Sequence, residues 1–532
     1  MLPPPPTVPV VRSPWRQVRE FAALEGDATF LWPRWIVLRA VGIVYILIFA
    51  GIIASGRALV GPEGIAPLPE FFAHQIRTYP SAVEAFLRAP GLFWISAGGG
   101  MLAALSWAGL AAAVAVTLNL WPRLALFGCW LIFLSFITTG RFFAATQPDQ
   151  LMIEAALLCI PFAPAGLRPG LGANSPPRPI ALFMARWLLL RIMFEAGVMK
   201  LVAGEQWRNL TAMDVMYETT PFPTILGYLD HQLPHAYHVF EIGLTFAAEL
   251  AAPLLAVFSG RRGRWIAFAL WAAFQAGIEL TNNFGWLNGA AIALGVLLLD
   301  DQMLAAAASR CKWRRPAALL AARTPPPPVP AIGPWGLWSL RGALGLQFVL
   351  TLFFFGVAWT TPTNALARTV FGPVEYLFGD FHSSNAYPLF EGLPPIRYGL
   401  EFEGSNDGGE TWRTYPFRYQ PQRVDRICPF IAPWYARFEA TLEITLNAVP
   451  NSPIFAAVAT HLLQHDPKVI GLFVRDPFPD RPPMMVRMPV YLLNFTDFAT
   501  YRKTGRFWRK EYEGDYAPML YTDDDGKVVS AK

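Results

Sequence analysis

Long apolar stretches constrain this chain more than any other feature of its sequence. A helix needs about 20 predominantly apolar residues to cross a membrane, because no water is available there to satisfy an exposed backbone. Such stretches lie near 36–55, 92–118, 122–139, 150–163, 180–203, 237–258, 265–280, 287–299 and 343–360. The sequence therefore predicts a polytopic α-helical membrane bundle of about nine spans. The fourth and eighth stretches are short enough to be re-entrant.

Composition supports a protein whose main solvent is lipid. Hydrophobic residues make up 54% of the 532 residues and charged residues 15%, whereas about 25% charged residues is typical of soluble chains. The net charge of +5 is too small and too scattered to indicate a nucleic-acid binder. Cys129, Cys159, Cys311 and Cys428 are far apart, which argues against a disulfide framework or a zinc site.

Arginine and lysine residues are distributed unevenly between alternate loops. With a cytoplasmic N-terminus, sixteen lie in the inside segments and five in the opposite loops, namely Arg57, Arg77, Arg88, Arg141 and Arg208. Cytoplasmic loops carry the excess of positive charge, and an odd number of spans then places everything after Thr360 on the non-cytoplasmic side. The membrane is expected to be the plasma membrane in a bacterium and the endoplasmic reticulum membrane in a eukaryote.

Three regions follow from these patterns: a cytoplasmic N-terminal tail (1–30), the helical bundle (31–360) and a non-cytoplasmic C-terminal soluble domain (361–532). The N-terminal tail opens with a proline run, Pro3–Pro6, and lacks the apolar core of a signal peptide, so the first span is expected to be retained. A second proline-rich stretch, Thr324–Pro330, is expected to be a stiff spacer before the last span.

The C-terminal domain is predicted to be an α+β, β-sandwich-like fold. Residues 397–402 and 412–419 have strand-like patterns and flank Ser405–Trp412, which matches the Asp-box pattern S-x-D-x-G-x-T-W. In that pattern Asp and Gly close a hairpin, so a structural role is favoured over a ligand site. Residues 454–465 and 468–473 are expected to be helical, and 485–494 to form another strand.

Ionisable residues occur within several predicted spans, where they are costly unless they pair or line a cavity. Arg191 and Glu195 are four residues apart and share one helical face, so an internal pair is plausible; Lys200 lies about one turn further along. Glu241 and Glu249 also share a face, and Glu154 and Glu279 lie in other spans. Together they predict a polar seam inside the bundle. Its role is either structural or that of a cavity for a lipid, a quinone or a polypeptide segment.

The segment after the fifth span, Trp207–Pro223, mixes aromatic, acidic and proline residues where a simple connector would be short and polar. It is expected to pack over the bundle mouth, and its distinctive members are Trp207, Arg208, Thr211, Asp214, Tyr217 and Glu218. Nearby, His231, His235 and His238 have helical spacing, but Pro234 interrupts them. His461 and His465 lack the glutamate of a zinc-protease motif. The sequence therefore predicts neither a metal site nor a cofactor site.

Several segments resemble the lipase maturation factor family. They include Arg186–Lys200, Trp207–Pro223, Phe240–Glu249, Thr281–Asn288, Arg426–Pro433, Val474–Pro479 and Gly514–Pro518. The resemblance implies a multi-pass membrane protein that helps secreted lipases reach an active dimeric fold, with its C-terminal domain facing the lumen in animals. The chain departs from the family pattern at Arg437–Glu443, which puts a client contact there in doubt.

The segment Phe194–Lys200, followed by Trp207, also resembles more distantly the membrane part of vitamin-K-dependent γ-glutamyl carboxylases. That resemblance implies that Lys200 acts as a base toward a quinone. A transporter or channel is disfavoured because the sequence shows no clear repeat, and two main hypotheses follow. The favoured one is a non-enzymatic assembly factor whose partners are membrane lipid and a secreted client such as a lipase; the alternative is a membrane enzyme that acts on a quinone or lipid through Lys200. The oligomeric state is left open.

Overall fold

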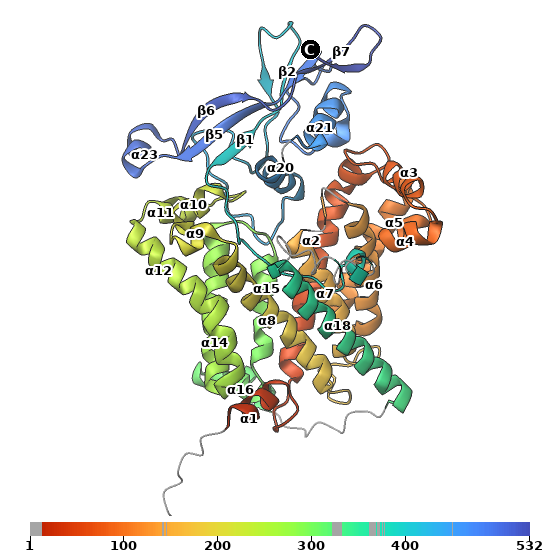
Figure 1. Ribbon diagram of the computed structural model, residues 1–532, viewed down its shortest axis with the longest axis vertical. Helices are drawn as coiled ribbons and strands as arrows, with labels where there is room; N and C mark the ends of the chain where they lie inside the picture. Colours follow the sequence, from red (N-terminus) through yellow and green to blue (C-terminus); the bar gives the residue numbers. More distant parts are fainter. Residues whose placement is uncertain are drawn as a thin grey trace, which may run out of the picture.

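The computed structural model describes residues 13–531 except 141–142, 145, 322–331, 361–368, 370–372, 375, 377 and 450. A helical region forms one end of the molecule and a smaller region of strands and helices forms the other (Figure 1). Both proline-rich stretches, residues 361–368 directly after the last predicted span, and Arg12, Arg141 and Arg323 of the charge comparison lie outside the described residues.

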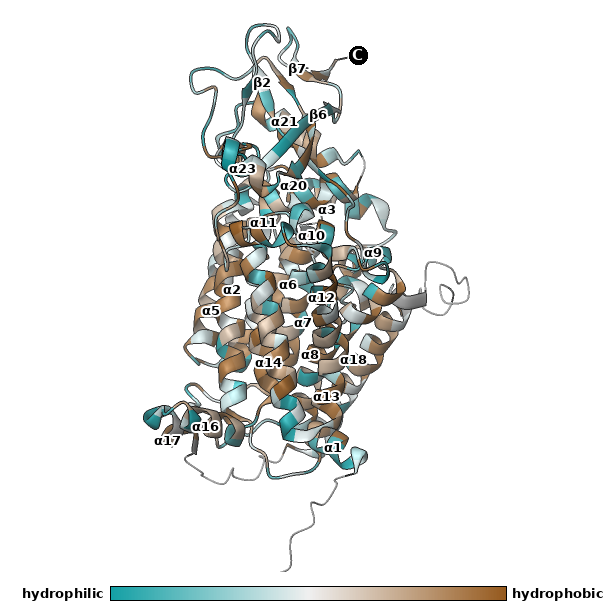
Figure 2. Ribbon diagram, turned by 90° about the vertical axis from the view of Figure 1, so that its left-hand side faces the viewer, coloured by the Kyte–Doolittle hydropathy of each residue, from teal (hydrophilic) through white to brown (hydrophobic). Residues whose placement is uncertain are grey.

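Each of the nine predicted spans overlaps a helix, although the α-helix in the predicted span 92–118 begins only at Gly99. The helices are α2 (Leu31–Val60), α5 (Gly99–Thr117), α6 (Pro122–Thr139), α7 (Gln147–Phe162), α8 (Pro179–Val202), α12 (His235–Phe246) continued by α13 (Ala252–Phe258), α14 (Gly260–Thr281), α15 (Leu287–Gly295) and α18 (Pro334–Thr360). A π-helical turn, Ala247–Ala251, joins α12 to α13. Hydrophobic residues predominate along most of these helices, whereas α16 (Asp301–Arg310) and α17 (Arg314–Ala321) at the end of the bundle carry more hydrophilic residues (Figure 2).

Fewer of these helices are long and apolar enough to qualify as spans on their own. Within the described residues five do so: Leu31–Val60, Gly99–Thr117, Pro122–Thr139, His235–Phe258 and Pro334–Gly356. A sixth is added if Leu287–Leu298 and Asp301–Arg310, bent by 104°, count as one. The predicted nine spans are therefore not confirmed. The physical reason is clearest in α8, which carries Arg186, Arg191, Glu195 and Lys200, and in α7 and α15, which are short.

Small residues let the bundle helices approach closely. A Cβ atom built on Gly109 of α5 would lie 2.3 Å from the ring of Phe49 on α2. Phe49 in turn packs edge-to-face with Phe133 of α6 at a centroid distance of 6.3 Å, and Tyr45 packs against both rings. The core of the bundle therefore depends on a glycine that admits an aromatic ring between two backbones.

The C-terminal region contains two antiparallel sheets. One has the order β1 (Arg397–Leu400), β5 (Pro489–Phe495), β6 (Trp508–Asp515); the other has the order β3 (Arg413–Thr414), β2 (Glu403–Ser405), β4 (Met485–Arg487), β7 (Leu520–Thr522), β8 (Val528–Ser530). The accompanying helices are α20 (Arg437–Ala448), α21 (Pro453–Leu463), α22 (Pro467–Ile470) and α23 (Phe498–Thr504). The α+β composition agrees with the prediction, and a sandwich packing of the two sheets stays a prediction.

The Asp-box segment closes the hairpin between β2 and β3. Asp407 accepts hydrogen bonds from the Thr411 N–H at 2.9 Å and from the Ser405 hydroxyl at 2.7 Å, and Glu403 pairs with Thr414 across the strands. One predicted pairing is wrong, because β1 does not flank this turn: Arg397 pairs with Leu493 of β5 in the other sheet. The strand-like run 397–402 ends at the point where the chain passes from one sheet to the other.

Candidate functional site

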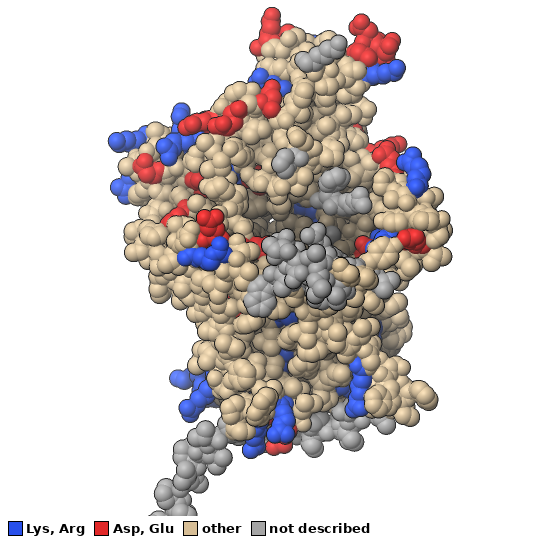
Figure 3. Space-filling view, in the orientation of Figure 1, with Lys and Arg blue, Asp and Glu red and all other residues tan. Residues whose placement is uncertain are grey.

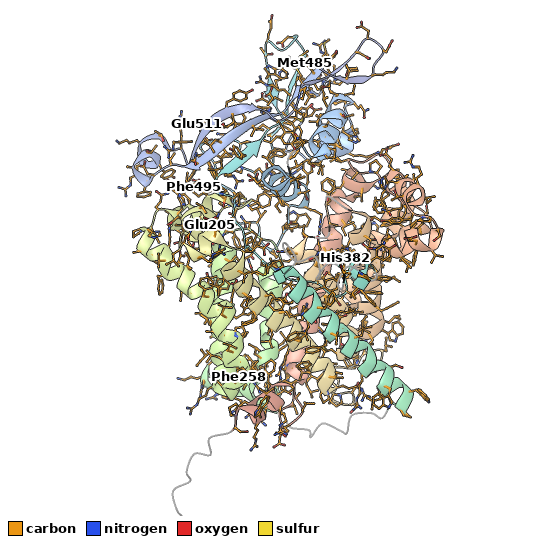
Figure 4. The ribbon with its side chains drawn as sticks, viewed as in Figure 1. Glu205, Phe258, His382, Met485, Phe495 and Glu511 are labelled. Atoms are coloured by element: carbon orange, nitrogen blue, oxygen red, sulfur yellow. The ribbon has the colours of Figure 1, made fainter. Side chains whose placement is uncertain are left out.

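A segment between α18 and β1, residues 382–393, lies against the mouth of the bundle; we call it the junction segment. Figure 4 labels its first residue, His382, which directly follows the short helix η4 (Gly379–Phe381). Arg191 of α8 donates to the Asn385 carbonyl at 2.6 Å, and Glu195 accepts the Tyr387 N–H at 2.8 Å. Glu154 of α7 forms an ion pair with Arg191 and accepts the Tyr387 hydroxyl at 2.8 Å. These buried groups form the first polar cluster.

This cluster corrects the predicted pair. The carboxylate bound to Arg191 is Glu154, on a neighbouring helix, rather than Glu195, one turn away on α8. The guanidinium of Arg191 and the carboxylate of Glu154 are 2% and 0% exposed, so removing either partner would leave a buried charge. Glu195 instead binds the backbone of the junction segment.

Lys200 is the centre of a second polar cluster. Its Nζ donates to Glu249 Oε1 at 2.8 Å and to the Leu389 carbonyl at 2.8 Å, and lies 5.1 Å from the centre of the Trp207 ring. Trp207 donates its indole N–H to the Phe390 carbonyl at 2.8 Å. The predicted seam is therefore divided into two clusters, and the junction segment contacts both.

Close packing of α8 on the π-helical turn positions the second cluster. A Cβ atom built on Gly197 would lie 2.7 Å from a Leu250 side-chain carbon and 2.9 Å from Glu249 Cβ. A glycine at this position lets α8 approach the turn. Lys200, about one helical turn from Gly197, thereby reaches Glu249. π-Helical turns occur frequently at functional sites.

A cavity of about 380 Å³ adjoins the second cluster. It is lined by Lys200, Trp207, Met213, Met216, Tyr217, Asp230, Tyr237, Glu241, Leu244, Thr245, Glu249, Leu270, Ala273, Phe274, Gly277, Ile278, Thr281, Asn282 and Phe390. Tyr217 donates its hydroxyl to Glu241 Oε1 at 2.7 Å. The structure thus brings five sequence-predicted residues, Lys200, Trp207, Tyr217, Glu241 and Glu249, to one cavity, which we take as the candidate site.

The other distinctive residues of the Trp207–Pro223 segment lie around this cavity rather than in its lining. The segment forms α9 (Glu205–Arg208) and α10 (Ala212–Thr219). Arg208 donates to the Leu201 and Val202 carbonyls, and the Thr211 N–H donates to the Gln206 carbonyl. These contacts hold the segment to the end of α8.

Glu218 connects α10 to the C-terminal region. Its carboxylate accepts the Phe495 N–H at 2.5 Å, and Phe495 is labelled above α10 and α11 (Ile225–His231) in Figure 4. Burial raises the pKa of Glu218, and the Phe495 N–H opposes that effect. Glu218 therefore acts at an interface between the two parts of the chain.

The three histidines do not share one helix face. α11 ends at His231 and α12 begins at His235, after Pro234. Asp214 binds His235 Nδ1 at 2.9 Å and His238 Nδ1 at 2.8 Å, so these residues tie α10 to α12. Within the described part of the chain, no group of three or more His, Cys, Asp and Glu residues has an arrangement that could hold a metal ion.

Sequence reasoning missed two buried ion pairs, one that connects the C-terminal region to the bundle and one that joins β1 to α20 within that region. Arg437 of α20 binds both oxygens of Asp149 on α7, at 2.7 and 2.8 Å. Arg397 of β1 pairs with Glu443 at 3.1 Å, and burial raises the pKa of Glu443 to about 7 while Arg397 opposes the shift. Arg437, the first residue of the segment Arg437–Glu443 that was predicted to depart from the family pattern, therefore lies at the interface with the bundle. No local spacing links Arg437 to a residue 288 positions away.

These features define an integral membrane protein with several apolar helices and a C-terminal region of strands and helices docked on its bundle. The model of the lipase maturation factor transmembrane domain matches residues 32–306, and that of the lipase maturation factor C-terminal domain matches residues 383–518. The chain belongs to the lipase maturation factor family.

The relatives are distant but nearly full-length. Lipase maturation factor 1 of Bos taurus is 25% identical over 93% of this chain and 90% of its own length. Lipase maturation factor 2 of Mus musculus is 26% identical over 92% of this chain and 83% of its own length. No solved structure matches the chain. The comparisons lend no support to the enzyme alternative or to the carboxylase resemblance.

Proposed function

We propose that this protein is a membrane-anchored maturation factor that assists the folding or assembly of secreted proteins, with lipases as the client class. The observation that carries the proposal is that models of both family domains match this one chain. The junction segment supports it, because Lys200 and Arg191 bind its backbone and so couple the bundle to the C-terminal region. The bundle would then position the C-terminal region where clients emerge from the membrane.

The test is the specific activity of a secreted lipase in a host that lacks its own member of this family. Expression of the full chain is expected to raise the ratio of lipase activity to secreted lipase protein several-fold, because a maturation factor changes the folded fraction. Arg423→Ala, which breaks only an exposed ion pair with Asp425, is the matched control and should retain the effect. If the ratio stays at the level of the empty vector while the protein is abundant in the membrane, the proposal fails.

We also propose that the bundle crosses the membrane nine times and that residues after Thr360 are non-cytoplasmic. The distribution of charge supports this orientation. Lys and Arg gather at the end of the bundle away from the C-terminal region, while both signs are mixed at the other end (Figure 3). The positive end is expected to be cytoplasmic. In a bacterium this arrangement would expose the C-terminal domain outside the plasma membrane, and in a eukaryote in the lumen of the endoplasmic reticulum.

Thiol labelling tests the orientation. Cys311 is exposed at the end of α16, whereas the other three cysteines are buried. A membrane-impermeant maleimide is expected to label Cys311 only after the membrane is permeabilised. A Ser530→Cys variant made in a Cys311→Ser background introduces an exposed thiol in β8 and should be labelled in intact bacterial cells, where the proposed orientation places it outside the plasma membrane. Labelling of Cys311 in intact cells would reverse the proposed orientation.

A further inference from the structure

The candidate cavity has an apolar wall that faces the surface of the bundle. α12 and α14 supply Leu244, Leu270, Phe274 and Ile278 to its lining. The side chain of Leu244 is 42% exposed, on a helix that is long and apolar enough to span a membrane. A Cβ atom built on Gly277, also in the lining, meets nothing within 4 Å. The gap between these helices is therefore open toward the region that lipid would occupy.

The opposite wall is acidic and incompletely satisfied. Glu249 is 4% exposed and binds Lys200 through Oε1, but its Oε2 has no hydrogen-bond partner among the described residues. Glu241 binds the Tyr217 hydroxyl through Oε1, and its Oε2 is likewise unpartnered there. Buried acceptors without donors cost free energy. Both glutamates line the same cavity, so a ligand there meets two carboxylates that each have one oxygen without a donor among the described residues.

The charge balance of the lining specifies what kind of donor fits. Asp230, Glu241 and Glu249 supply three carboxylates, and Lys200 supplies one ammonium. A head with negative charge alone would be repelled by these carboxylates, whereas a head that ends in a cationic group would offset their charge and donate to the free oxygens. A small hydrophilic cation fits the cavity less well than an amphiphile, because it would leave the apolar part of the lining without a contact.

We propose that this cavity binds an amphiphile with a primary ammonium head and an alkyl chain. The head lies at Glu241 and Glu249, and the chain lies between α12 and α14. The ligand enters sideways from the membrane through the gap beside Gly277. This proposal does not depend on the proposed client role, because binding of the ligand to the cavity is measured without a client protein.

Three variants make the proposal testable. Gly277→Leu fills the cavity from a position where a side chain has room. Gly243→Leu is the matched control, because Gly243 lies on exposed α12 surface, also has open space, and is absent from the cavity lining. Glu241→Gln removes one negative charge and leaves the Lys200–Glu249 pair intact, so that it tests the head-group preference without breaking a buried ion pair.

The experiment uses the full chain in lipid nanodiscs and a twelve-carbon primary amine that carries a photoreactive diazirine on its chain. The matching diazirine carboxylate serves as the comparison probe, and mass spectrometry maps the cross-linked peptides. The amine is expected to label peptides of α12 and α14 about fivefold more than the carboxylate, a difference of about 1 kcal/mol. Gly277→Leu should abolish most of that labelling, Gly243→Leu should leave it unchanged, and Glu241→Gln should reduce the preference for the amine.

Equal labelling by the two probes, or labelling that Gly277→Leu leaves unchanged, would overturn the proposal. The lipid composition of the nanodisc then distinguishes two possible sources of the primary ammonium group, a membrane lipid and a free alkylamine. Weaker labelling in discs of phosphatidylethanolamine than in discs of phosphatidylglycerol identifies a membrane lipid as the ligand class, because that lipid carries the primary ammonium. Equal labelling in both kinds of disc, with the variant effects retained, identifies a free alkylamine.

Discussion

Replacing Arg191 with methionine is expected to lower the free energy of unfolding by about 3–5 kcal/mol, the usual cost of breaking a buried ion pair from one side. The change leaves the carboxylate of Glu154, which is 0% exposed, without its cation. It also removes the hydrogen bond to the Asn385 carbonyl, and with it one attachment of the junction segment. Unfolding of the purified protein by sodium dodecyl sulfate, followed by loss of helical circular dichroism, measures the change.

A second variant separates charge from packing. Arg191→Met combined with Glu154→Gln removes both charges and keeps a side chain that can bind the Tyr387 hydroxyl, so we expect it to recover at least half of the lost stability. Arg77→Met, at an exposed position of α3 (Leu68–Thr78), is the control, with an expected change within about 0.5 kcal/mol. A loss below about 1 kcal/mol for the single Arg191 variant would mean that the pair is not a major source of stability.

Arg437→Ala is expected to loosen the C-terminal region from the bundle and to cost about 3 kcal/mol of stability. Asp149, whose side chain is 0% exposed, would lose both of its contacts to the guanidinium, and the Phe143 carbonyl would lose a donor at 2.6 Å. Hydrogen–deuterium exchange should accelerate in α20 and in the first turn of α7. The bundle core around Tyr45 and Phe49 should keep its protection, because these rings pack on each other and on Phe133 of α6.

Arg437→Lys provides the graded comparison. Lysine keeps the charge but has no planar fork to bind both oxygens of Asp149, so exchange in α20 should fall between that of the wild type and that of the alanine variant. Arg423→Ala removes a pair in which both side chains are largely exposed and should leave exchange unchanged. Unaltered protection of α20 in Arg437→Ala would show that other contacts hold the two regions together.

Hydropathy was sufficient to place the helices, because a helix in lipid requires a long apolar run whichever other segments it packs against. Hydropathy was less reliable for the number of spans. The charged residues of α8 face the interior of the bundle, where their ion-pair partners offset the free-energy cost of burying them. The charge pattern correctly singled out Arg191, Glu195 and Lys200 as buried groups. It named the wrong partner for Arg191, because spacing along a helix shows only neighbours on that helix.

In the candidate site too, the sequence identified the residues but not their contacts. Lys200, Glu241, Glu249, Trp207 and Tyr217 stood out in the sequence because ionisable and amphipathic residues are unusual in or beside apolar spans. Their convergence on one cavity required the close approach of α8 to the π-helical turn at Gly197. The contribution of the junction segment was invisible beforehand, since it binds Lys200 and Trp207 through backbone carbonyls that every residue possesses.

The sequence by itself determined that this protein is an apolar helical bundle with a mixed C-terminal region, and which charged residues the bundle must accommodate. Those properties follow from the amino-acid composition and from the spacing of residues within one or two helical turns. Only the tertiary structure decided that Arg191 pairs with Glu154, that Arg437 reaches Asp149, and that two carboxylate oxygens remain unpartnered beside an apolar wall. Such contacts depend on how distant segments pack, because an ion pair or a cavity exists only where their surfaces meet.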